Sequence, residues 1–206
     1  MNSELITIDK QKLRKKFLEL RLKLDEKIKK QKDKKILKNL ISLDEFKKAK
    51  NVMIYYPFKN EVNVLELIKI FKDKNFFFPV VNFKKKVLEI RRYNDGKFVK
   101  NKFGIFEPKG KSLKKIKLDF IVVPGIVFDE KCFRIGFGGG YYDKFLKNVD
   151  CFTCGVCYDF QIVKSLPVEK NDVKLDCIVS EKRIIFSREV VIRKVTFRVK
   201  ERRGLL

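Results

Sequence analysis

The sequence contains no histidine among its 206 residues. This absence excludes every mechanism in which an imidazole acts as the general base or activates a serine or cysteine nucleophile. Long apolar runs are missing as well, because no stretch approaches the ~18 consecutive apolar residues that a membrane-spanning helix needs. The first residues also lack the basic-then-apolar order of a secretory signal peptide. We therefore expect a cytoplasmic protein that does not enter the membrane.

Two common phosphate-binding motifs are also absent. A Walker A loop ends in Gly-Lys-Ser/Thr, whereas Gly140 is followed by Tyr141. A dinucleotide-binding fingerprint that began at Gly136 would need a glycine where Tyr141 stands. A nucleotide, if one binds, must therefore be held by a different kind of loop.

Acidic residues are scarce relative to basic ones. The chain has 26 Asp and Glu against 50 Lys and Arg, which gives a formal net charge of +24. Such an excess is typical of nucleic-acid-binding proteins, and a basic nucleic-acid-binding protein stays open as the alternative function. However, lysines outnumber arginines and are spread between apolar residues on helix faces, which indicates solvated surface. A polyanionic small molecule also accounts for part of the charge, so we regard nucleic acid as the less favoured partner.

The five cysteines have no secretory context, so we expect reduced thiols. Cys151, Cys154 and Cys157 have the spacing of half a metal site, but their surroundings are apolar and aromatic and predict a buried strand. In a strand Cys154 faces away from the other two, and Cys151 and Cys157 lie about 20 Å apart. These geometries favour thiols in the core over metal ligands.

A glycine-rich stretch is the most distinctive feature that is present. Gly136 and Gly138 to Gly140 are preceded by Arg134 and followed by Tyr141, Tyr142, Asp143 and Lys144. Glycines at this density expose backbone N–H groups and permit positive φ, so a phosphate can approach the main chain. The residues after Gly140 predict the start of a helix. A cation before the loop and a carboxylate after it suit a nucleotide phosphate with its metal.

Hydrophobic periodicity predicts helices in the first part of the chain. We expect an amphipathic helix over residues 9–30, with Lys10 and Arg14 one turn apart on one face. A second helix is expected around residues 36–41. A capping box at Ser42 and Glu45 predicts a third helix that ends at Ala49, and Asn63 with Glu66 predicts a cap for a fourth.

Alternation of strands with helices predicts an α/β fold, a three-layer sandwich with a mostly parallel, Rossmann-like central sheet. Residues 1–186 are expected to form a single domain and residues 187–206 a basic C-terminal extension, in which apolar residues from Val190 to Val199 suggest a strand. We expect a hairpin between residues 87–93 and 98–99 around the Asn94-Asp95-Gly96 turn. The remaining strands are expected at residues 52–56, 76–81, 120–123, 152–156, 177–179 and 183–186.

The run from Phe128 to Leu146, FDEKCFRIGFGGGYYDKFL, resembles the signature of the 5-formyltetrahydrofolate cyclo-ligases, also called methenyltetrahydrofolate synthetases. The resemblance spans roughly residues 10–186 in unbroken order. Further matching positions are Lys10, Arg14, Glu61-Val62, residues 103–108 and 119–125, Gln161, and residues 166–176.

This resemblance implies an enzyme that uses ATP and Mg²⁺ to convert 5-formyltetrahydrofolate to 5,10-methenyltetrahydrofolate, with release of ADP and phosphate. The formyl oxygen is phosphorylated first, and N10 of the folate then attacks the activated carbon. Such chemistry needs positioning and charge neutralisation more than protein nucleophiles, which agrees with a chain without histidine. The expected partner is the small-molecule folate, polyglutamylated or not, and the expected state is a monomer.

The resemblance also implies site residues. Arg14, Arg134 and Lys144 are expected to be catalytic, Asp143 and Asp172 to bind Mg²⁺, and Glu61 to bind the N–H groups of the pterin. Tyr56, Phe58 and Tyr142 are expected to contact the folate. The residues expected to bind ATP are Lys10, Lys12, Arg14, Arg134, Gly136, Phe137, Gly138, Gly139, Gly140, Tyr141, Tyr142, Asp143 and Lys144.

Three positions depart from the family pattern. Asn63-Val64 replaces a frequent Asp-Thr, so a hydroxyl role there is excluded. Cys132 stands where glycine is common, and Asn171 stands where many members have histidine.

Overall fold

A seven-stranded sheet forms the centre of the computed structural model, which describes residues 3–94, 96–102 and 104–194. Its strands are β1 (Asn51–Met53), β2 (Asn75–Asn82), β3 (Val87–Arg92), β6 (Phe120–Val123), β9 (Phe152–Val156), β11 (Cys177–Val179) and β12 (Ile184–Phe186). They lie in the order β12-β11-β9-β6-β1-β2-β3. The five inner strands are parallel and both edge strands are antiparallel to their neighbours, so the predicted mostly parallel sheet is confirmed.

The central strands are buried on both faces. In β6, Phe120 and Val122 belong to one apolar core, while Ile121 and Val123 belong to the other. A continuous apolar run is what a parallel strand needs when helices cover both of its faces. The run of four apolar residues therefore explains why β6 occupies the middle of the sheet.

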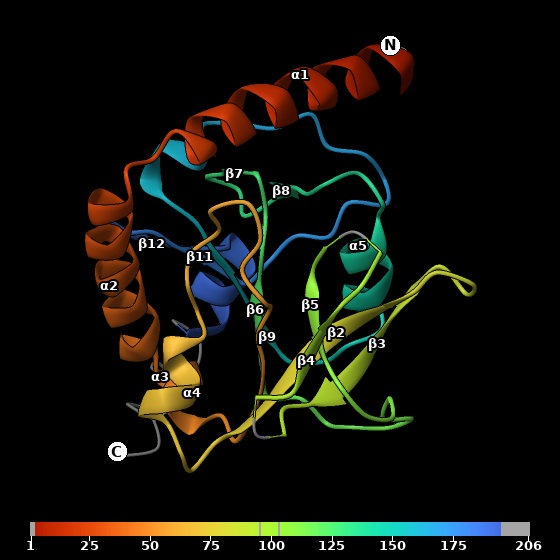
Figure 1. Cartoon of the computed structure of the whole chain (residues 1–206). Helices are drawn as coiled ribbons and strands as arrows, with labels where there is room; N and C mark the ends of the chain where they lie inside the picture. The colour runs from red at the N-terminus through yellow and green to blue at the C-terminus, as the bar shows by residue number, and fades with distance from the viewer. Residues whose placement is uncertain (1–2, 95, 103, 195–206) are drawn as a thin grey trace, which may run out of the picture.

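Helices cover the two faces of this sheet, as Figure 1 shows. The first face carries α2 (Glu26–Ser42), α3 (Asp44–Lys48) and α4 (Glu66–Ile70), which bury Leu40, Phe46 and Leu67 against it. The other face carries α5 (Tyr141–Leu146), which contributes Leu146 to the second core. The predicted three-layer architecture is confirmed.

A small second sheet lies beyond the carboxyl ends of the central strands. It consists of β7 (Val127–Asp129), β8 (Arg134–Ile135) and β10 (Ile162–Val163). The long helix α1 (Ser3–Leu22) lies across it, above β7 and β8 in Figure 1. Phe17 of α1 is buried with Val127, Ile135 and Leu166, so this apolar contact holds α1 over the end of the sheet.

The expected hairpin between residues 87–93 and 98–99 is wrong. β3 pairs with β2 along six registered positions and so forms the edge of the large sheet. β4 (Phe98–Lys100) instead pairs with β5 (Phe106–Pro108) in a separate two-stranded sheet. The ring of Phe98 packs on Tyr56 and Phe78, and these contacts turn β4 away from β3.

The helix boundaries differ from the predicted ones at three places. A single helix over residues 9–30 is wrong, because α1 ends at Leu22 and Asp25 caps α2 by accepting a 3.0 Å hydrogen bond from Ile28 N. The Ser42 capping box is wrong as well, since Ser42 Oγ donates to Asn39 O at 2.7 Å and α3 begins at Asp44. Asn63 Oδ1 accepts from Leu65 N, but α4 begins only at Glu66.

Two strand predictions also need correction. The strand expected over residues 52–56 ends at Met53, and the chain then leaves the sheet. Residues 188–194 are helical, with Val190 buried, so the strand expected from Val190 onward is wrong for this part. Its remainder, Val195 to Val199, lies outside the described residues. A short 3₁₀ turn, η1 (Asp159–Gln161), completes the described elements, of which no helix combines the length and hydropathy of a membrane span.

The cysteines lie where the strand interpretation predicts. Cys154 belongs to one core, whereas Cys157 and the partly buried Cys151 belong to the other. Burial raises the pKa of the Cys151 thiol to about 12 and that of Cys157 well above its usual value. These thiols are therefore protonated packing groups, and the prediction that they lie in the core is confirmed.

Candidate functional site

The candidate site lies where β1 and β6, which are neighbours in the sheet, reach their carboxyl ends. Residues 54–61 follow β1 and lead toward α4. The chain after β6 passes through β7 and β8 to the glycine loop, residues 136–140, which enters α5. Ligands in open α/β sheets bind at this edge, so both predicted loops are in the expected place.

The glycine loop adopts a backbone that needs glycine at two positions. Gly138 has φ of 101° and Gly140 has φ of 64°, both in the left-handed region. Residues 138–140 are exposed, and within the described ranges none of their N–H groups donates a hydrogen bond to another backbone group. The predicted helix start after the loop is confirmed at Tyr141, but α5 has only six residues. The loop's backbone and its surrounding cations, rather than a long helix dipole, therefore define this part of the site.

Arg14 lies along the glycine loop. Its Nε donates to Gly136 O at 2.8 Å. A Cβ atom added at Gly138 would lie 3.6 Å from Arg14 Cζ, which shows how closely the guanidinium follows the loop. α1 thus places a cation beside the exposed N–H groups.

Arg134 supplies a second, buried cation at the start of the loop. Its side chain is only 3% exposed, and Nη2 lies 3.2 Å from Asp143 Oδ1 while Nη1 donates to Val173 O. Burial lowers the pKa of Arg134 from its usual value, and the charge of Asp143 opposes this shift. The guanidinium also lies over the ring of Tyr142, at 5.9 Å from the ring centroid.

Lys10, one turn before Arg14, is the third cation. Its Nζ lies 2.6 Å from Asp172 Oδ2 and 3.0 Å from Glu169 Oε1. Asp172 also accepts a hydrogen bond from Glu169 N. Asp143 pairs with Arg134 and Asp172 with Lys10, and the charge of Asp172 also opposes the lowering of the Arg134 pKa. Three cations and three carboxylates, Glu169 included, are therefore grouped on the segments around the glycine loop.

This donor set is compatible with a nucleotide and a divalent cation. The cations and exposed N–H groups suit phosphate oxygens, and Asp143 and Asp172 offer the oxygen ligands that Mg²⁺ prefers. Among residues 3–94, 96–102 and 104–194, no group of three or more His, Cys, Asp or Glu side chains is arranged as a metal site. A metal held here would accordingly rely on phosphate or water oxygens for its other ligands.

Glu61 is buried on the other side of the site. Its side chain is 6% exposed, Oε2 accepts from Phe58 N at 3.0 Å, and Oε1 lies 3.8 Å from Arg21 Nη2. Burial raises the pKa of Glu61 to about 7, against the opposing effects of the Arg21 charge and the Phe58 N–H. A carboxyl group with free acceptor capacity in a poorly solvated place is suited to bind paired N–H donors.

The charge of Glu61 affects the pKa of two tyrosines. Burial raises the pKa of both Tyr55 and Tyr142, and the charge of Glu61 contributes to each shift. Tyr55 Oη donates to Val62 O at 3.1 Å. In the described part of the chain, the buried Tyr142 hydroxyl has no hydrogen-bond partner. Tyr142 therefore lies against Arg134, and its hydroxyl is available to a ligand.

Aromatic side chains join the two loops. The rings of Phe58 and Phe137 are 5.8 Å apart, and Lys59 Nζ lies over both. Phe137 is 49% exposed, an unusual state for a phenylalanine in a folded protein. Tyr56 packs instead against Phe98 and Phe106, with ring centroids 5.1 and 4.8 Å away. These rings offer flat apolar surface beside Glu61.

Not every predicted residue is drawn into this arrangement. Lys12 and Lys144 are exposed, and neither side chain forms an ion pair with a residue that the structure describes. Tyr141 is half-buried, and its ring would lie 2.7 Å from a Cβ added at Gly139. The roles of Lys12, Lys144 and Tyr141 stay predictions.

Arg21 is the residue that the sequence analysis missed. It lies on α1 seven positions after Arg14, two turns along the same face, and its side chain is 1% exposed. It contacts the Glu61 loop, the chain after β6 and the glycine loop. The spacing of Lys10, Arg14, Phe17 and Arg21 at intervals of four, three and four could have indicated it.

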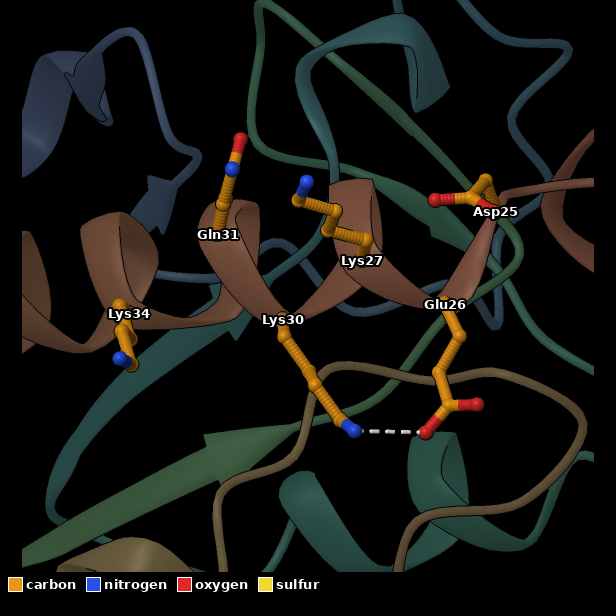
Figure 2. A pocket seen from close by; sticks show the side chains of 6 residues that line it. All are labelled: Asp25, Glu26, Lys27, Lys30, Gln31 and Lys34. Carbon is orange, nitrogen blue, oxygen red and sulfur yellow. Dashed lines mark ion pairs between the residues drawn. The ribbon is translucent and has the colours of Figure 1, made fainter.

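A surface hollow of about 450 Å³ lies elsewhere, along the start of α2. Its lining consists of Asp25, Glu26, Lys27, Lys30, Gln31 and Lys34. Figure 2 shows that Lys27 and Gln31 point to one side of the helix and Glu26 and Lys30 to the other, where these two form a 2.7 Å ion pair. Because the lining comes from one helix and does not converge, we do not assign this hollow as the site.

Comparison with known proteins shows to which family the chain is similar. Residues 6–181 match the model of the 5-formyltetrahydrofolate cyclo-ligase family. The chain is 33% identical to the 5-formyltetrahydrofolate cyclo-ligase of Haemophilus influenzae, over 82% of this chain and 96% of that protein. The solved 5,10-methenyltetrahydrofolate synthetase of Aquifex aeolicus has a TM-score of 0.77 at 38% identity, covering 87% of this chain and 93% of that one. The synthetase of Mycoplasma pneumoniae has a TM-score of 0.70 at 26% identity, covering 84% and 99%.

Proposed function

The chain belongs to the 5-formyltetrahydrofolate cyclo-ligase family, and we propose that it is the ATP-dependent enzyme that converts 5-formyltetrahydrofolate to 5,10-methenyltetrahydrofolate. ADP and phosphate are the other products. One observation carries the proposal at the level of the site: a glycine loop surrounded by three cations meets the loop of the buried Glu61 through the contact of Phe58 and Phe137. A phosphate donor and a pterin would therefore lie side by side.

The phosphates of ATP are assigned to the glycine loop. Arg14 and Arg134 flank the exposed N–H groups of residues 138–140, and Lys10 lies one turn from Arg14. Charge-assisted hydrogen bonds from guanidinium groups suit phosphate oxygens better than neutral donors do. Arg14 and Arg134 also stabilise the negative charge that develops on the transferred phosphoryl group.

Asp143 and Asp172 would hold Mg²⁺. In the structure each carboxylate neutralises a cation, Arg134 and Lys10 respectively. When bound, the metal ion supplies charge neutralisation and orientation of phosphate oxygens. The two aspartates would then exchange part of their ion pairing with the cations for ligation, and this frees Lys10 and Arg134 for phosphate.

The folate is assigned to the Glu61 side. The carboxylate accepts hydrogen bonds from the amino and ring N–H groups of the pterin, while Phe58 and Tyr56 provide apolar surface for the ring. The Tyr142 hydroxyl has no partner in the described part of the chain, and Arg134 lies over its ring, so this hydroxyl is available to donate to the ligand. This supports the proposal that Tyr142 contacts the folate.

The reaction follows from bringing these two sites together. The formyl oxygen attacks the γ-phosphorus of ATP, a new O–P bond forms, and the bond to ADP breaks. N10 then attacks the activated formyl carbon, loses its proton, and closes the ring as the C–O bond to phosphate breaks. Arg14 and Arg134 hold the transferred group in line with the formyl oxygen, and Glu61 fixes the orientation of the pterin. Positioning and charge neutralisation are the main contributions of the protein.

The decisive experiment follows the absorbance of the methenyl product. Purified protein is mixed with 5-formyltetrahydrofolate and MgATP, and phosphate release is measured in parallel. We expect one phosphate per methenyl group formed, and no product when ATP is omitted or Mg²⁺ is chelated. Turnover without nucleotide, or none with both ligands present, contradicts the assignment.

A further inference from the structure

Arg21, in the last turn of α1, connects the three segments that form the site. Its Nε donates to Lys59 O at 2.9 Å, in the loop that carries Glu61. Its Nη1 donates to Gly125 O at 2.9 Å, directly after β6. The guanidinium also lies over the ring of Phe137 in the glycine loop, 6.0 Å from its centroid. One planar side chain thus fixes the relative positions of both binding loops.

The third guanidinium nitrogen of Arg21, Nη2, donates to neither binding loop. Nη2 is buried and has no hydrogen-bond partner among the residues that the structure describes. It lies 3.8 Å from Glu61 Oε1, beyond hydrogen-bond distance. Because buried donors are almost always satisfied, an unpaired Nη2 beside the carboxylate leaves a position that a ligand or a water molecule can complete.

The titratable groups that interact electrostatically with Glu61 come from three elements. Arg21 approaches it from α1, Tyr55 from the segment after β1, and Tyr142 from α5. The tyrosines are neutral because burial keeps their hydroxyl groups protonated. Arg21 is therefore the charged group, within the described ranges, that opposes the effect of burial on Glu61.

We propose that Arg21 is a positioning residue of the folate site, which holds the Glu61 loop in place and keeps the Glu61 carboxylate ionised when a bound pterin excludes water. This inference rests on the proposed function. An ionised carboxylate can accept two parallel N–H donors, whereas a protonated one presents a hydroxyl group to one of them. Loss of the Arg21 charge would leave Glu61 with burial alone, and burial favours the protonated form.

The test measures the affinity for 5-formyltetrahydrofolate from pH 6 to pH 9 in the full chain. Wild-type protein should bind more weakly as the pH falls below about 7, where Glu61 becomes protonated. In Arg21→Gln this weakening should begin at least one pH unit higher, so that affinity at pH 7 falls about fivefold or more and recovers toward pH 9. The affinity for ATP should change little in Arg21→Gln, and Lys23→Gln, an exposed neighbour, should match wild type throughout.

A second variant keeps the test decisive if Arg21→Gln does not fold. Arg21→Lys retains the charge but not the planar fork, so binding should weaken at every pH with an unchanged pH profile. A shifted profile in Arg21→Lys, or an Arg21→Gln profile that superposes on wild type, overturns the inference while the proposed function stands. Absence of folate binding by the wild-type protein overturns the proposed function and this inference with it.

Discussion

Replacing Glu61 with glutamine should raise the stability of the protein while weakening its affinity for folate. The substitution keeps the shape of the side chain and an oxygen that can accept from Phe58 N. It removes the negative charge from a position that is 6% exposed. One change therefore tests both the energetic cost and the role of this carboxylate.

The stability change follows from the shift of the Glu61 pKa from 4.5 to about 7. Because the folded protein binds this proton more tightly than the unfolded chain, the free energy of unfolding falls as the pH rises from about 4.5 to 7. The total loss is about 3 kcal/mol at higher pH. Glutamine does not titrate. The free energy of unfolding of Glu61→Gln, relative to that of wild type, should therefore increase by about 2–3 kcal/mol from pH 5 to pH 8.

The binding change has the opposite sign. An amide presents a donor where the pterin N–H groups need an acceptor, which leaves a buried mismatch of about 1–3 kcal/mol. The affinity for 5-formyltetrahydrofolate should fall by roughly one to two orders of magnitude, whereas the affinity for ATP should be unaffected. Urea unfolding at pH 5 and pH 8, together with calorimetric titration of each ligand, measures both effects.

Glu66→Gln provides a matched control, because Glu66 is a more exposed carboxylate at the start of the neighbouring α4. It should show neither the stability gain at pH 8 nor the loss of folate affinity. The reasoning about Glu61 is refuted if the difference in unfolding free energy between Glu61→Gln and wild type is the same at both pH values. Equal losses of affinity for folate and ATP would indicate misfolding instead.

Three further predictions concern the glycine loop and the two terminal segments. Gly140→Ala should lower stability by about 1–2 kcal/mol and raise the KM for ATP, because Gly140 has φ of 64° and alanine is strained in this conformation. In the control Gly136→Ala the added Cβ meets open space, so the melting temperature should stay unchanged. Arg14→Ala should lower kcat/KM for ATP about tenfold to a hundredfold, because a charge-assisted contact is lost. Lys15→Ala, which changes an exposed neighbour, is the control. Equal effects of the two substitutions would contradict this role of Arg14. Deleting residues 195–206 should leave turnover within a few-fold of wild type. Deleting residues 188–206 should in addition lower the melting temperature, because it removes the buried Val190 and the 2.9 Å Arg193–Asp176 ion pair. An inactive but folded 1–194 protein would contradict the assignment of residues 187–206 as an extension, which stays a prediction.

Much of the fold was predictable because burial on both faces leaves a clear pattern. The apolar run of β6 and the strand–helix–strand order around α4 indicated the parallel sheet directly. The pairing of β3 could not be derived in the same way, since a turn signal at Asn94 is compatible with either neighbour. Long-range contacts, here the packing of Phe98 on Tyr56, decide between them.

The site was predictable where backbone chemistry dominates and less so where burial decides. The glycines of the loop predicted a phosphate site, whereas Lys10 and Arg14 were added to it by the resemblance to the family. Lys12 is two residues from both Lys10 and Arg14. It therefore lies about 200° around the helix axis from each of them, on the exposed face of α1. Arg21 was missed because a buried arginine looks like any surface arginine until its carbonyl partners, distant in the chain, are known.

The contacts of α1 with residues far along the chain affect the order in which the protein folds. Its contacts with Asp172, Gly136 and Gly125 join residues that lie 162, 122 and 104 positions apart. At a synthesis rate of about 5–20 residues per second, Asp172 follows Lys10 by about 10–30 s. Until Val127 and Ile135 have been made, Phe17 of α1 lacks these apolar partners, and contacts between residues so distant in the chain form late in folding. The proposed ligand site is therefore assembled only after most of the chain has been synthesised.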